Sequence, residues 1–295
     1  MFRSGFVAIV GSPNAGKSSL INKIFSRKIS IVSDKVQTTR DMIKGIYNDE
    51  NHQIIFLDTP GFHKPNNKLQ VYMNNQIEYA LSQVDLIIYV LDAKYGLGKK
   101  EEVNIKRIKQ EKSCKKICLI NKIDLIDHTD VIKLVHEVEE LNLFDQVFAI
   151  SIKNGFDVDS FINDIGSYLT DDMKYYDDDQ LVDYSNQFYV EEIIREKINN
   201  YCFDEIPHSV AIKVAEMIEE DNLLNIYVDI YVERDSQKGI IIGKGGSQIK
   251  KIGQEARTEL KRYFNQPIYL DIHVKVLKNW NQKERDLLNL GYEDL

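Results

Sequence analysis

Five short, nearly continuous apolar runs alternate with helical stretches along the first 170 residues, and no other feature constrains the fold as strongly. Strands buried on both faces of a parallel sheet have this continuous apolar character, whereas half-exposed strands alternate apolar with polar residues. The runs are residues 6–10, 53–58, 85–92, 116–121 and 146–151. The helical stretches that separate or follow them are Lys17–Phe25, Asn74–Ser82, Glu101–Gln110, Asp130–Leu141 and Val158–Leu169. The alternation predicts an α/β fold with a doubly wound, mostly parallel sheet.

A second unit of a different kind is expected after a short acidic segment. Residues 171–179 hold five aspartates and one lysine, which is typical of a solvated linker. Beyond it the pattern predicts a helix, two strands, a helix and a strand, at Phe188–Asn199, Val210–Met217, Leu223–Val232, Ser247–Phe264 and Ile268–Val276. We therefore predict a first domain at 1–170, an acidic linker at 171–186, and an α+β domain with a tail at 187–295.

The composition excludes several classes of protein. The net charge of −8 is opposite to that of a general polyanion binder, so a nucleic-acid site must be a local basic patch. The central apolar run, Leu86–Leu91, is far shorter than the roughly 20 residues that span a bilayer. The N-terminus has no secretory signal pattern, and Cys114, Cys118 and Cys202 form no CxxC pair. We expect a soluble cytoplasmic protein with buried structural thiols.

A phosphate-binding motif lies directly between the first predicted strand and the first predicted helix. Residues 11–18 read GSPNAGKS, which matches GxxxxGK[ST] in the structural context that this motif requires. Backbone N–H groups of such a loop surround phosphate oxygens, and the helix N-terminus adds partial positive charge. We expect Lys17 to reach the β- and γ-phosphates and the Ser18 hydroxyl to bind Mg²⁺. The motif serves ATPases and GTPases alike, so the base must be identified elsewhere.

A base-recognition motif stands at the carboxyl end of a predicted buried strand, where open α/β sheets bind ligands. Residues 121–124 read NKID, and the Asp124 carboxylate can accept two hydrogen bonds from guanine, whereas adenine offers no donors there. Asn121 is expected to tether the loop and the Lys122 stem to cover the base. The loop after the next strand holds Ser151, Ile152 and Lys153. Its backbone donors suit the guanine O6, so the sequence predicts a guanine nucleotide site.

Two further segments complete a nucleotide switch. Residues 58–61 read DTPG at another strand end, where Asp58 would hold the metal through water and the Gly61 N–H would sense the γ-phosphate. The polar stretch 26–40 has no helical or strand period, and a threonine in it could complete the Mg²⁺ shell when GTP is bound. We favour Thr39 over Thr38 for this role.

The site residues expected from these motifs fall into three groups. Those at the nucleotide are Gly11, Ser12, Pro13, Asn14, Ala15, Gly16, Lys17, Ser18, Ser19, Asp58, Thr59, Pro60, Gly61, Asn121, Lys122, Asp124, Ser151, Ile152 and Lys153. Those at the γ-phosphate during hydrolysis are Lys17, Thr39 and Gly61. Those at the metal are Ser18, Thr39 and Asp58.

The residue after Gly61 is Phe62, at the position where Ras-like GTPases have a glutamine that orients the attacking water. Phenylalanine has no hydrogen-bonding group, so the water must be held differently and unaided hydrolysis should be slow. For the next residue, His63, we expect a solvated loop position rather than contact with the water. No arginine finger in cis is evident, and for Arg40, beside the favoured threonine, we expect a structural salt bridge.

The second domain carries a basic segment with a glycine loop. Residues 236–264 hold seven Lys or Arg against two Glu, a local charge of +5. Within it, residues 243–246 read GKGG, a GXXG loop that opens a helix, and in KH domains this loop clamps a single-stranded nucleic-acid backbone. We expect Ile240–Ile242, Ile249 and Ile252 to form the floor of the groove. The residues expected to bind RNA are Gly243, Lys244, Gly245, Gly246, Lys250, Lys251 and Arg257.

Taken in order, these motifs resemble the Era family of bacterial GTPases over essentially the whole chain. The resemblance rests on the P-loop, QTTR at 37–40, DTPG, NKID, SIK, the acidic linker, VERDSQKGIIIGKGGSQIKKIGQEAR at 232–257 and the tail at 274–292. It implies a GTP-hydrolysing switch whose type II KH domain binds the 3′ region of 16S ribosomal RNA during assembly of the 30S subunit. That family also lacks the catalytic glutamine. It further implies peripheral association with the inner face of the cell membrane, which nothing in this sequence requires. We expect a monomer with no DNA partner.

Some interpretations stay open. Asn14 resembles the asparagine with which some GTPases that lack the glutamine hold K⁺ near the β- and γ-phosphates, where a cation could replace an arginine finger. Alternatively, Asn14 only braces the loop. A tRNA-modifying or membrane-transport GTPase would need further catalytic or transmembrane segments. A constitutive RNA-binding protein with a mainly structural nucleotide domain would bind RNA equally in both nucleotide states.

Overall fold

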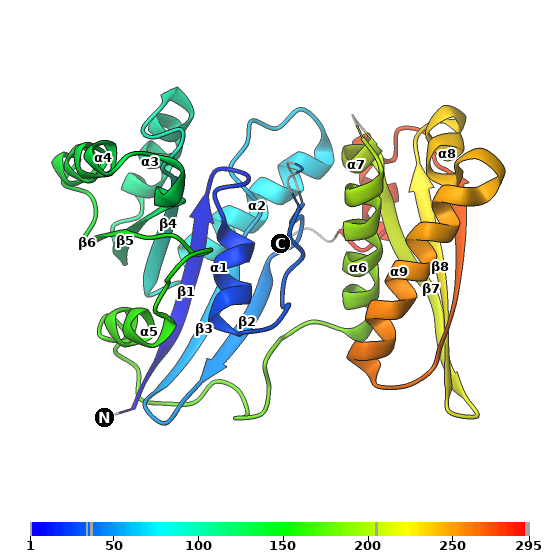
Figure 1. The fold of residues 1–295 in the computed structure, drawn as a ribbon, viewed down its shortest axis with the longest axis horizontal. Helices are drawn as coiled ribbons and strands as arrows, with labels where there is room; N and C mark the ends of the chain where they lie inside the picture. The colour runs from blue at the N-terminus through cyan, green and yellow to red at the C-terminus, as the bar shows by residue number, and fades with distance from the viewer. Residues whose placement is uncertain (1, 34, 36–37, 204–205, 293–295) are drawn as a thin grey trace.

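The computed structural model describes residues 2–33, 35, 38–203 and 206–292. Within these residues the strands form two separate sheets, one of six strands and one of three. Figure 1 shows the two sheets side by side, with helix α6 (Asn186–Tyr201) on the side of the smaller sheet that faces the larger one. We call the part up to Leu169 the amino-terminal unit and the part from Ser185 the carboxyl-terminal unit.

The larger sheet has the strand order β2-β3-β1-β4-β5-β6. Its strands are β1 (Arg3–Gly11), β2 (Ile43–Asn48), β3 (His52–Asp58), β4 (Leu86–Asp92), β5 (Lys115–Asn121) and β6 (Gln146–Ala149). All of its neighbours pair in parallel except β2, which runs antiparallel to β3. Every residue of β3 and β4 is buried, which explains their unbroken apolar runs. The predicted doubly wound, mostly parallel sheet is confirmed.

Helices cover both faces of this sheet. They are α1 (Lys17–Ile24), α2 (Lys68–Ser82), α3 (Lys99–Gln110), α4 (His128–Glu140) and α5 (Val158–Gly166). Buried side chains of α1 and α5 pack on one face, in a cluster that includes Leu20 and Ile165. Buried side chains of α2, α3 and α4 pack on the other, in a cluster that includes Ile77 and Ile108. Since both faces are covered, the carboxyl ends of the strands remain the open edge at which a ligand can bind.

Two elements of this unit differ from the sequence prediction. Strand β2 was not expected, because its six residues show neither a continuous apolar run nor a clean alternation. Helix α2 begins at Lys68, six residues before the expected start at Asn74. The reason is local, since the Asn67 side chain caps the helix by accepting a hydrogen bond from the Gln70 N–H at 2.8 Å.

The carboxyl-terminal unit is a three-stranded sheet covered by helices on one face. After α6 come α7 (Ile206–Ser209), β7 (Ala211–Glu220), β8 (Leu223–Val232), α8 (Asp235–Ile242), α9 (Ser247–Phe264) and β9 (Ile268–Val276). Strands β7 and β8 are antiparallel, whereas β8 and β9 are parallel. The core between helices and sheet includes Ile193, Ile226 and Leu260. Helix α8 was not expected, because Ile240–Ile242 interrupt the helical period with consecutive apolar residues.

The acidic segment that joins the units is attached to the amino-terminal unit. The fully buried Gln53 donates to the Tyr176 carbonyl at 2.8 Å and accepts from the Tyr175 N–H at 2.6 Å. Further along, the Ile46 N–H of β2 donates to the Leu181 carbonyl at 2.9 Å, so the segment pairs with the sheet edge. The prediction of a solvated linker is therefore right for its exposed aspartates and wrong for its backbone.

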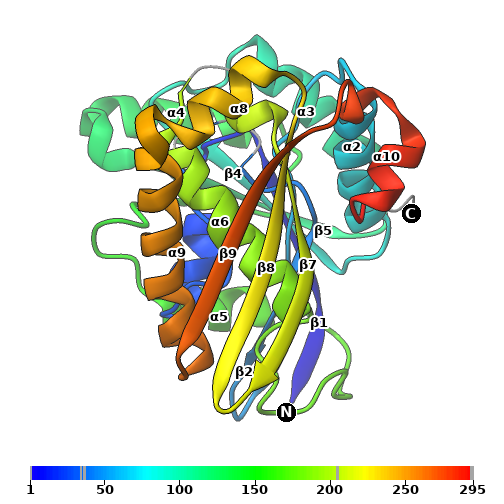
Figure 2. The same ribbon diagram turned by 90° about the vertical axis from the view of Figure 1, so that its right-hand side faces the viewer.

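The end of the chain returns to the amino-terminal unit. After β9, a short 3₁₀ turn (Trp280–Gln282) and helix α10 (Glu284–Asn289) lie against α2, as Figure 2 shows. Their apolar side chains form one buried cluster with α2, which includes Trp280, Leu287 and Met73. The two units thus share a hydrophobic interface in addition to the linker.

Candidate functional site

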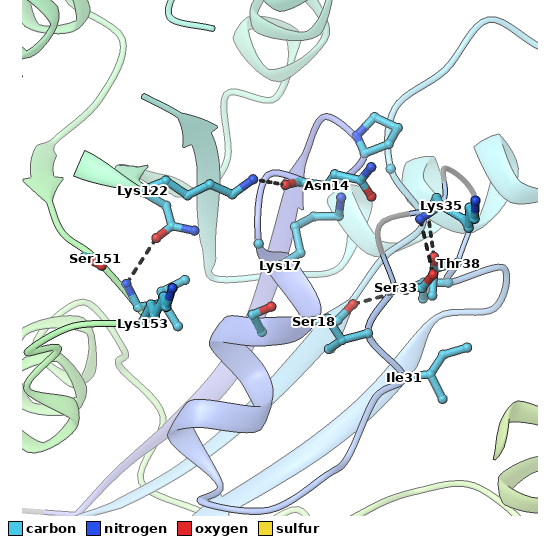
Figure 3. A pocket seen from close by; sticks show the side chains of 18 of the residues that line it. Asn14, Lys17, Ser18, Ile31, Ser33, Lys35, Thr38, Lys122, Ser151 and Lys153 are labelled. Carbon is cyan, nitrogen blue, oxygen red and sulfur yellow. Dashed lines mark hydrogen bonds between the residues drawn. The ribbon is translucent and has the colours of Figure 1, made fainter. Parts of the chain in front are cut away.

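A cavity of about 530 Å³ opens at the carboxyl ends of the strands in the amino-terminal unit, a volume typical of small-ligand sites. Figure 3 shows its side chains. Thirteen of the expected nucleotide residues line it, and they are Pro13, Asn14, Gly16, Lys17, Ser18, Ser19, Gly61, Asn121, Lys122, Asp124, Ser151, Ile152 and Lys153. Motifs about a hundred residues apart in sequence therefore surround one space.

The other expected nucleotide residues do not line the cavity. They are Gly11, Ser12, Ala15, Asp58, Thr59 and Pro60. Their role in the fold is visible in two hydrogen bonds, in which the Thr59 hydroxyl donates to the Ile9 carbonyl at 2.9 Å and the Phe62 N–H donates to the Gly11 carbonyl at 3.2 Å. These bonds fasten the DTPG loop to β1 and the P-loop.

The P-loop, residues 11–18, requires glycine where it passes the Asn121 side chain. Gly16 has φ +111°, and a Cβ there would lie 2.3 Å from the side-chain amide nitrogen of Asn121. The loop curls around the Lys17 ammonium, which donates to the carbonyls of Gly11 at 3.1 Å and Ser12 at 3.0 Å. Burial lowers the pKa of Lys17 to about 8, while the carboxylates of Asp58 and Glu101 act in the opposite direction.

Three oxygen-bearing side chains expected at the metal converge beside the P-loop. The Ser18 hydroxyl donates to Asp58 Oδ2 at 2.7 Å and lies 3.1 Å from the Thr39 hydroxyl. Asp58 is fully buried, its other carboxylate oxygen has no partner among the described residues, and burial raises its pKa. Thr38, by contrast, donates its hydroxyl to the Lys35 carbonyl at 2.7 Å. The geometry therefore brings Thr39, and not Thr38, to the expected metal position.

The base-recognition loops are fastened to the P-loop and to each other. The Asn121 amide donates to the Ala15 carbonyl at 2.9 Å and accepts from the Ile152 N–H at 3.2 Å. The Lys122 ammonium donates to the Asn14 carbonyl at 2.6 Å, a bond visible in Figure 3. The Ser151 hydroxyl donates to Asp124 Oδ1 at 2.6 Å. Asp124 thus faces the cavity as a hydrogen-bonded carboxylate.

Sequence reasoning missed part of the cavity wall. These further lining residues are Ile31, Val32, Ser33, Lys35 and Leu125. Four of them belong to the polar stretch 26–40, which was expected to respond to the nucleotide but without assignment of individual contacts. Gln37, of the QTTR motif, lies outside the described residues.

Arg40 and His63 differ from expectation, whereas for Phe62 the structure adds its surroundings. Arg40 forms no ion pair among the described residues and instead donates to backbone carbonyls of the carboxyl-terminal unit, so the predicted salt bridge is wrong. His63 is only partly exposed, and its Nδ1 lies 2.8 Å from the Gly61 carbonyl oxygen, so it is not a solvated loop histidine. Phe62 is buried, and the Arg107 guanidinium lies 5.2 Å above its ring. None of the three lines the cavity.

The three cysteines are free thiols. Cys118 and Cys202 are buried, as expected for structural thiols, whereas Cys114 is only partly buried and so differs from that expectation. Burial raises the pKa of the Cys202 thiol, which keeps it protonated.

The GXXG loop forms the turn between α8 and α9. Gly243, Gly245 and Gly246 all have positive φ, at +73°, +59° and +78°. A Cβ at Gly245 or Gly246 would meet no atom within 4 Å, so the loop presents an open backbone surface. The start of α9 is anchored by Gln248, whose amide donates to the Tyr201 carbonyl at 3.1 Å. This is a surface to which a phosphate backbone can approach closely.

The basic residues expected at RNA lie on the exposed side of this loop and helix. Lys244, Lys250, Lys251 and Arg257 are all exposed, and the Lys251 ammonium lies 4.1 Å from the centre of the Tyr201 ring. The expected groove floor is partly wrong. Ile241 and Ile252 are fully buried in the core, Ile240 is 49% exposed, and only Ile242 and Ile249 are partly exposed, as a groove floor requires.

Comparisons with known families identify both units. Residues 6–122 match the model of the family described as 50S ribosome-binding GTPase. Residues 205–281 match the KH domain family. None of the helices in the part of the chain that the structure describes is long and apolar enough to cross a membrane.

Solved structures similar over the full length include two of Era. A variant of Era from Aquifex aeolicus bound to GDP·AlF4⁻ is 34% identical with a TM-score of 0.95. Era in complex with MgGDPNP and nucleotides 1506–1542 of 16S ribosomal RNA is 35% identical with a TM-score of 0.96. In both comparisons the match covers 100% of this chain and 100% of the other.

Proposed function

The chain belongs to the Era family of GTPases, and from this premise we propose that it is a GTP-hydrolysing switch that binds the 3′ region of 16S ribosomal RNA and assists assembly of the 30S subunit. One observation carries the proposal: a nucleotide cavity and an exposed GXXG loop occur on one chain, and a loop that lines the cavity contacts the RNA-binding unit. The Era structure with MgGDPNP also contains nucleotides 1506–1542 of that RNA, which supports the assignment of the partner.

Guanine selection is assigned to Asp124. Its carboxylate accepts from N1–H and the exocyclic amine of guanine, while Ser151 holds the other side of the carboxylate. The Lys122 stem covers one face of the base. Because Asn121 joins the base loop to the P-loop, a correctly seated base places the phosphates in register with Lys17.

The phosphates are assigned to the P-loop and the DTPG loop. When the nucleotide binds, the Lys17 ammonium donates to the β- and γ-phosphates in place of the carbonyls of Gly11 and Ser12. The Gly61 N–H donates to the γ-phosphate. A Cβ at Gly61 would lie 2.8 Å from the Pro13 nitrogen, so only glycine allows this approach. These groups stabilise the charge that develops on the γ-phosphoryl oxygens during transfer to water.

The residues beside Ser18 fit Mg²⁺. Hydroxyl and carboxylate oxygens are the ligands that Mg²⁺ prefers, and the partnerless buried oxygen of Asp58 is the kind of group that a cation or its water satisfies. Ser18 and Thr39 would hold the ion directly and Asp58 through water. When bound, Mg²⁺ neutralises charge on the β- and γ-phosphates.

Hydrolysis without a partner is expected to be slow. Phe62 is buried and points no hydrogen-bonding group at the cavity, and His63 does not line it. We keep the proposal that Asn14 helps to hold K⁺ beside the phosphates. Asn14 lines the cavity with φ +63°, so it is placed where such an ion would lie.

RNA binding is assigned to the loop 243–246 and the exposed basic residues of α9. Glycines allow close approach of the phosphate backbone, and Lys250, Lys251 and Arg257 supply charge along its path. The domain limits 1–170, 171–186 and 187–295 are part of the same proposal, as are a cytoplasmic location, a monomeric state and peripheral contact with the inner face of the membrane.

The decisive test is RNA affinity in the two nucleotide states. The intact protein should bind a fragment of the 16S 3′ region several-fold to a hundredfold more tightly with a non-hydrolysable GTP analogue than with GDP, since typical couplings are about 1–3 kcal/mol. The double variant Lys244→Asp/Gly245→Asp should lose RNA binding and keep its affinity for GDP. Equal RNA affinity in both states would favour the alternative, a constitutive RNA-binding protein with a mainly structural nucleotide domain.

A second test addresses the base. Asp124→Asn replaces the acceptor carboxylate by an amide, so GTP affinity should fall and xanthosine triphosphate should be preferred, because its C2 carries an oxygen. The loss of one charged hydrogen-bonded pair should cost on the order of 2–5 kcal/mol. Wild-type affinity and discrimination in this variant would refute the assignment of the guanine pocket.

A further inference from the structure

The loop that forms one wall of the nucleotide cavity is attached to the carboxyl-terminal unit at its start. The Lys28 ammonium lies 2.6 Å from the carboxylates of both Glu196 on α6 and Glu259 on α9. The Tyr184 hydroxyl, from the segment that joins the two units, donates to the Ile29 carbonyl at 3.3 Å. The loop therefore leaves α1 along the surface of the other unit before it reaches the cavity.

The same loop is attached again at its end, by Arg40. This side chain is fully buried, and its guanidinium donates to the carbonyls of Val210 at 2.6 Å and Pro207 at 2.9 Å and to the Tyr292 hydroxyl at 3.2 Å. All three acceptors belong to the carboxyl-terminal unit. A planar guanidinium held by three acceptors in fixed directions allows little rotation, so Arg40 fixes the backbone that carries it.

The residue after Arg40 is held as well. Asp41 accepts a hydrogen bond from the Tyr72 hydroxyl of α2 at 2.8 Å. Tyr72 in turn packs edge-on against Tyr292, with 5.4 Å between the ring centres. Two successive residues are thus fixed to partners that meet at the interface between the units.

Thr39 lies directly before these two anchors. Its hydroxyl is 3.1 Å from that of Ser18, at the proposed metal position, and its side chain is buried. Adjacent Cα atoms are about 3.8 Å apart, so a fixed Arg40 leaves Thr39 little freedom to leave the cavity. By contrast, the described residues before Thr39, at 26–33, 35 and 38, lie in no helix or strand.

We propose that Arg40 is a positioning residue for the hydrolysis of GTP, and that it acts by presenting Thr39 to the metal site from an anchor in the carboxyl-terminal unit. The RNA-binding unit then supplies part of the scaffold of the nucleotide site. This inference rests on the proposed function, because it takes the role of Thr39 from there. It adds that the contact between the units is required for full activity.

The test compares four full-length proteins, namely wild type, Arg40→Ala, Thr39→Ala and the double variant. In single-turnover assays, Arg40→Ala should slow hydrolysis by tenfold to a hundredfold, on the order expected when a reacting group is misplaced by about 1 Å. The double variant should be no slower than Thr39→Ala alone, since Arg40 acts through Thr39. Affinity for GDP should stay within about twofold of wild type in all four, because the γ-phosphate is absent.

A second measurement does not depend on activity. In the protein without nucleotide and metal, hydrogen exchange of backbone amides at 38–42 should be faster in Arg40→Ala than in wild type, because the anchor is lost. Arg285→Ala is the control. Arg285 is an exposed arginine of α10, and its side chain makes no hydrogen bond or ion pair within the part of the chain that the structure describes. This control should leave hydrolysis and exchange unchanged.

Two variants guard against misfolding. If thermal melting shows that Arg40→Ala is not folded, the same hydrolysis assay is made with Arg40→Lys. Lysine keeps the positive charge but cannot donate to the carbonyls of Val210 and Pro207 at the same time. This variant should hydrolyse GTP at a rate between those of wild type and Thr39→Ala. Tyr292→Phe removes only the bond to the hydroxyl and should have a smaller effect in the same direction.

The outcomes separate the inference from the proposed function. If Thr39→Ala is slow but the Arg40 variants hydrolyse GTP at the wild-type rate, or if the two effects multiply in the double variant, the inference is wrong and the proposed function stands. If Thr39→Ala itself hydrolyses GTP normally, the assigned role of Thr39 is wrong and the inference is lost with it.

Discussion

Asn121 offers the clearest link between a single side chain and the integrity of the nucleotide site. Its amide group bridges the Ala15 carbonyl of the P-loop and the Ile152 N–H of the base loop, at 2.9 and 3.2 Å, and it is only 3% exposed. Replacement by alanine removes both bonds and leaves a buried acceptor and a buried donor without partners. Replacement by aspartate keeps the acceptor for Ile152 but places a carboxylate oxygen against the Ala15 carbonyl.

The expected magnitude follows from these two groups. A buried polar group left unsatisfied costs about 1–3 kcal/mol, so two such groups cost roughly 2–6 kcal/mol. The site borders an open cavity from which water can enter, so Asn121→Ala should lie near the lower end, about 2 kcal/mol in the free energy of unfolding. Asn121→Asp should lose at least as much, because two acceptors then face each other.

Urea unfolding of the nucleotide-free protein and the affinity for a fluorescent GDP measure these effects. The free energy of unfolding and the free energy of GDP binding should both become less favourable in Asn121→Ala. The two losses should be similar, because one side chain fastens both loops. The control is Asn154→Ala, which removes an exposed asparagine of the same base loop. An Asn121→Ala protein with unfolding free energy within 0.5 kcal/mol of wild type and unchanged GDP affinity would refute the reasoning, since the smallest expected loss is about 2 kcal/mol.

Three further predictions concern the other parts of the molecule. Gly61→Ala places a Cβ 2.8 Å from the Pro13 nitrogen, so it should abolish hydrolysis and weaken the binding of a GTP analogue more than the binding of GDP. Equal losses of affinity for both nucleotides would contradict this. If Asn14 helps to hold K⁺, hydrolysis should be faster in potassium than in sodium buffer of equal ionic strength, and equal rates would remove the idea. Lys250→Gln should lower the slope of log K against log salt for single-stranded RNA by about 0.7 without changing sequence preference, whereas an unchanged slope would place Lys250 away from the phosphates.

Much of the amino-terminal unit could be predicted because its signals are local. Continuous apolar runs marked strands β1, β3, β4 and β5, and phosphate and base motifs marked the ends of β1, β3 and β5. The earlier start of α2 was also visible in principle, because Asn67 followed by Gln70 is a capping signal. Strand β2 carries no such signal, since its position depends on pairing with β3.

What the sequence could not predict depends on contacts between distant residues. Arg40 next to Thr39 predicts a salt bridge on local grounds, yet its acceptors are carbonyls about 170 residues further along the chain. Helix α8 was not predicted because three consecutive isoleucines interrupt the helical spacing of apolar residues, although only Ile241 is fully buried. In both cases tertiary packing overrides the local pattern.

The attachment of the acidic segment to the sheet edge limits how far the two units can separate. The last hydrogen bond to β2 is made by Asp183, which donates to the Lys44 carbonyl at 3.2 Å, and Ser185 already caps α6. Only Tyr184 lies between them, so the tether has almost no slack and its closure entropy is small. While this pairing persists, the carboxyl-terminal unit can turn about one residue but cannot move away. For the carboxyl-terminal unit to move further from the sheet, the hydrogen bonds between residues 181–183 and β2 must break. Each released residue then adds at most about 3.5 Å to the length of the tether. The RNA-binding loop is therefore kept at a high effective concentration near the nucleotide site in every state that preserves this pairing.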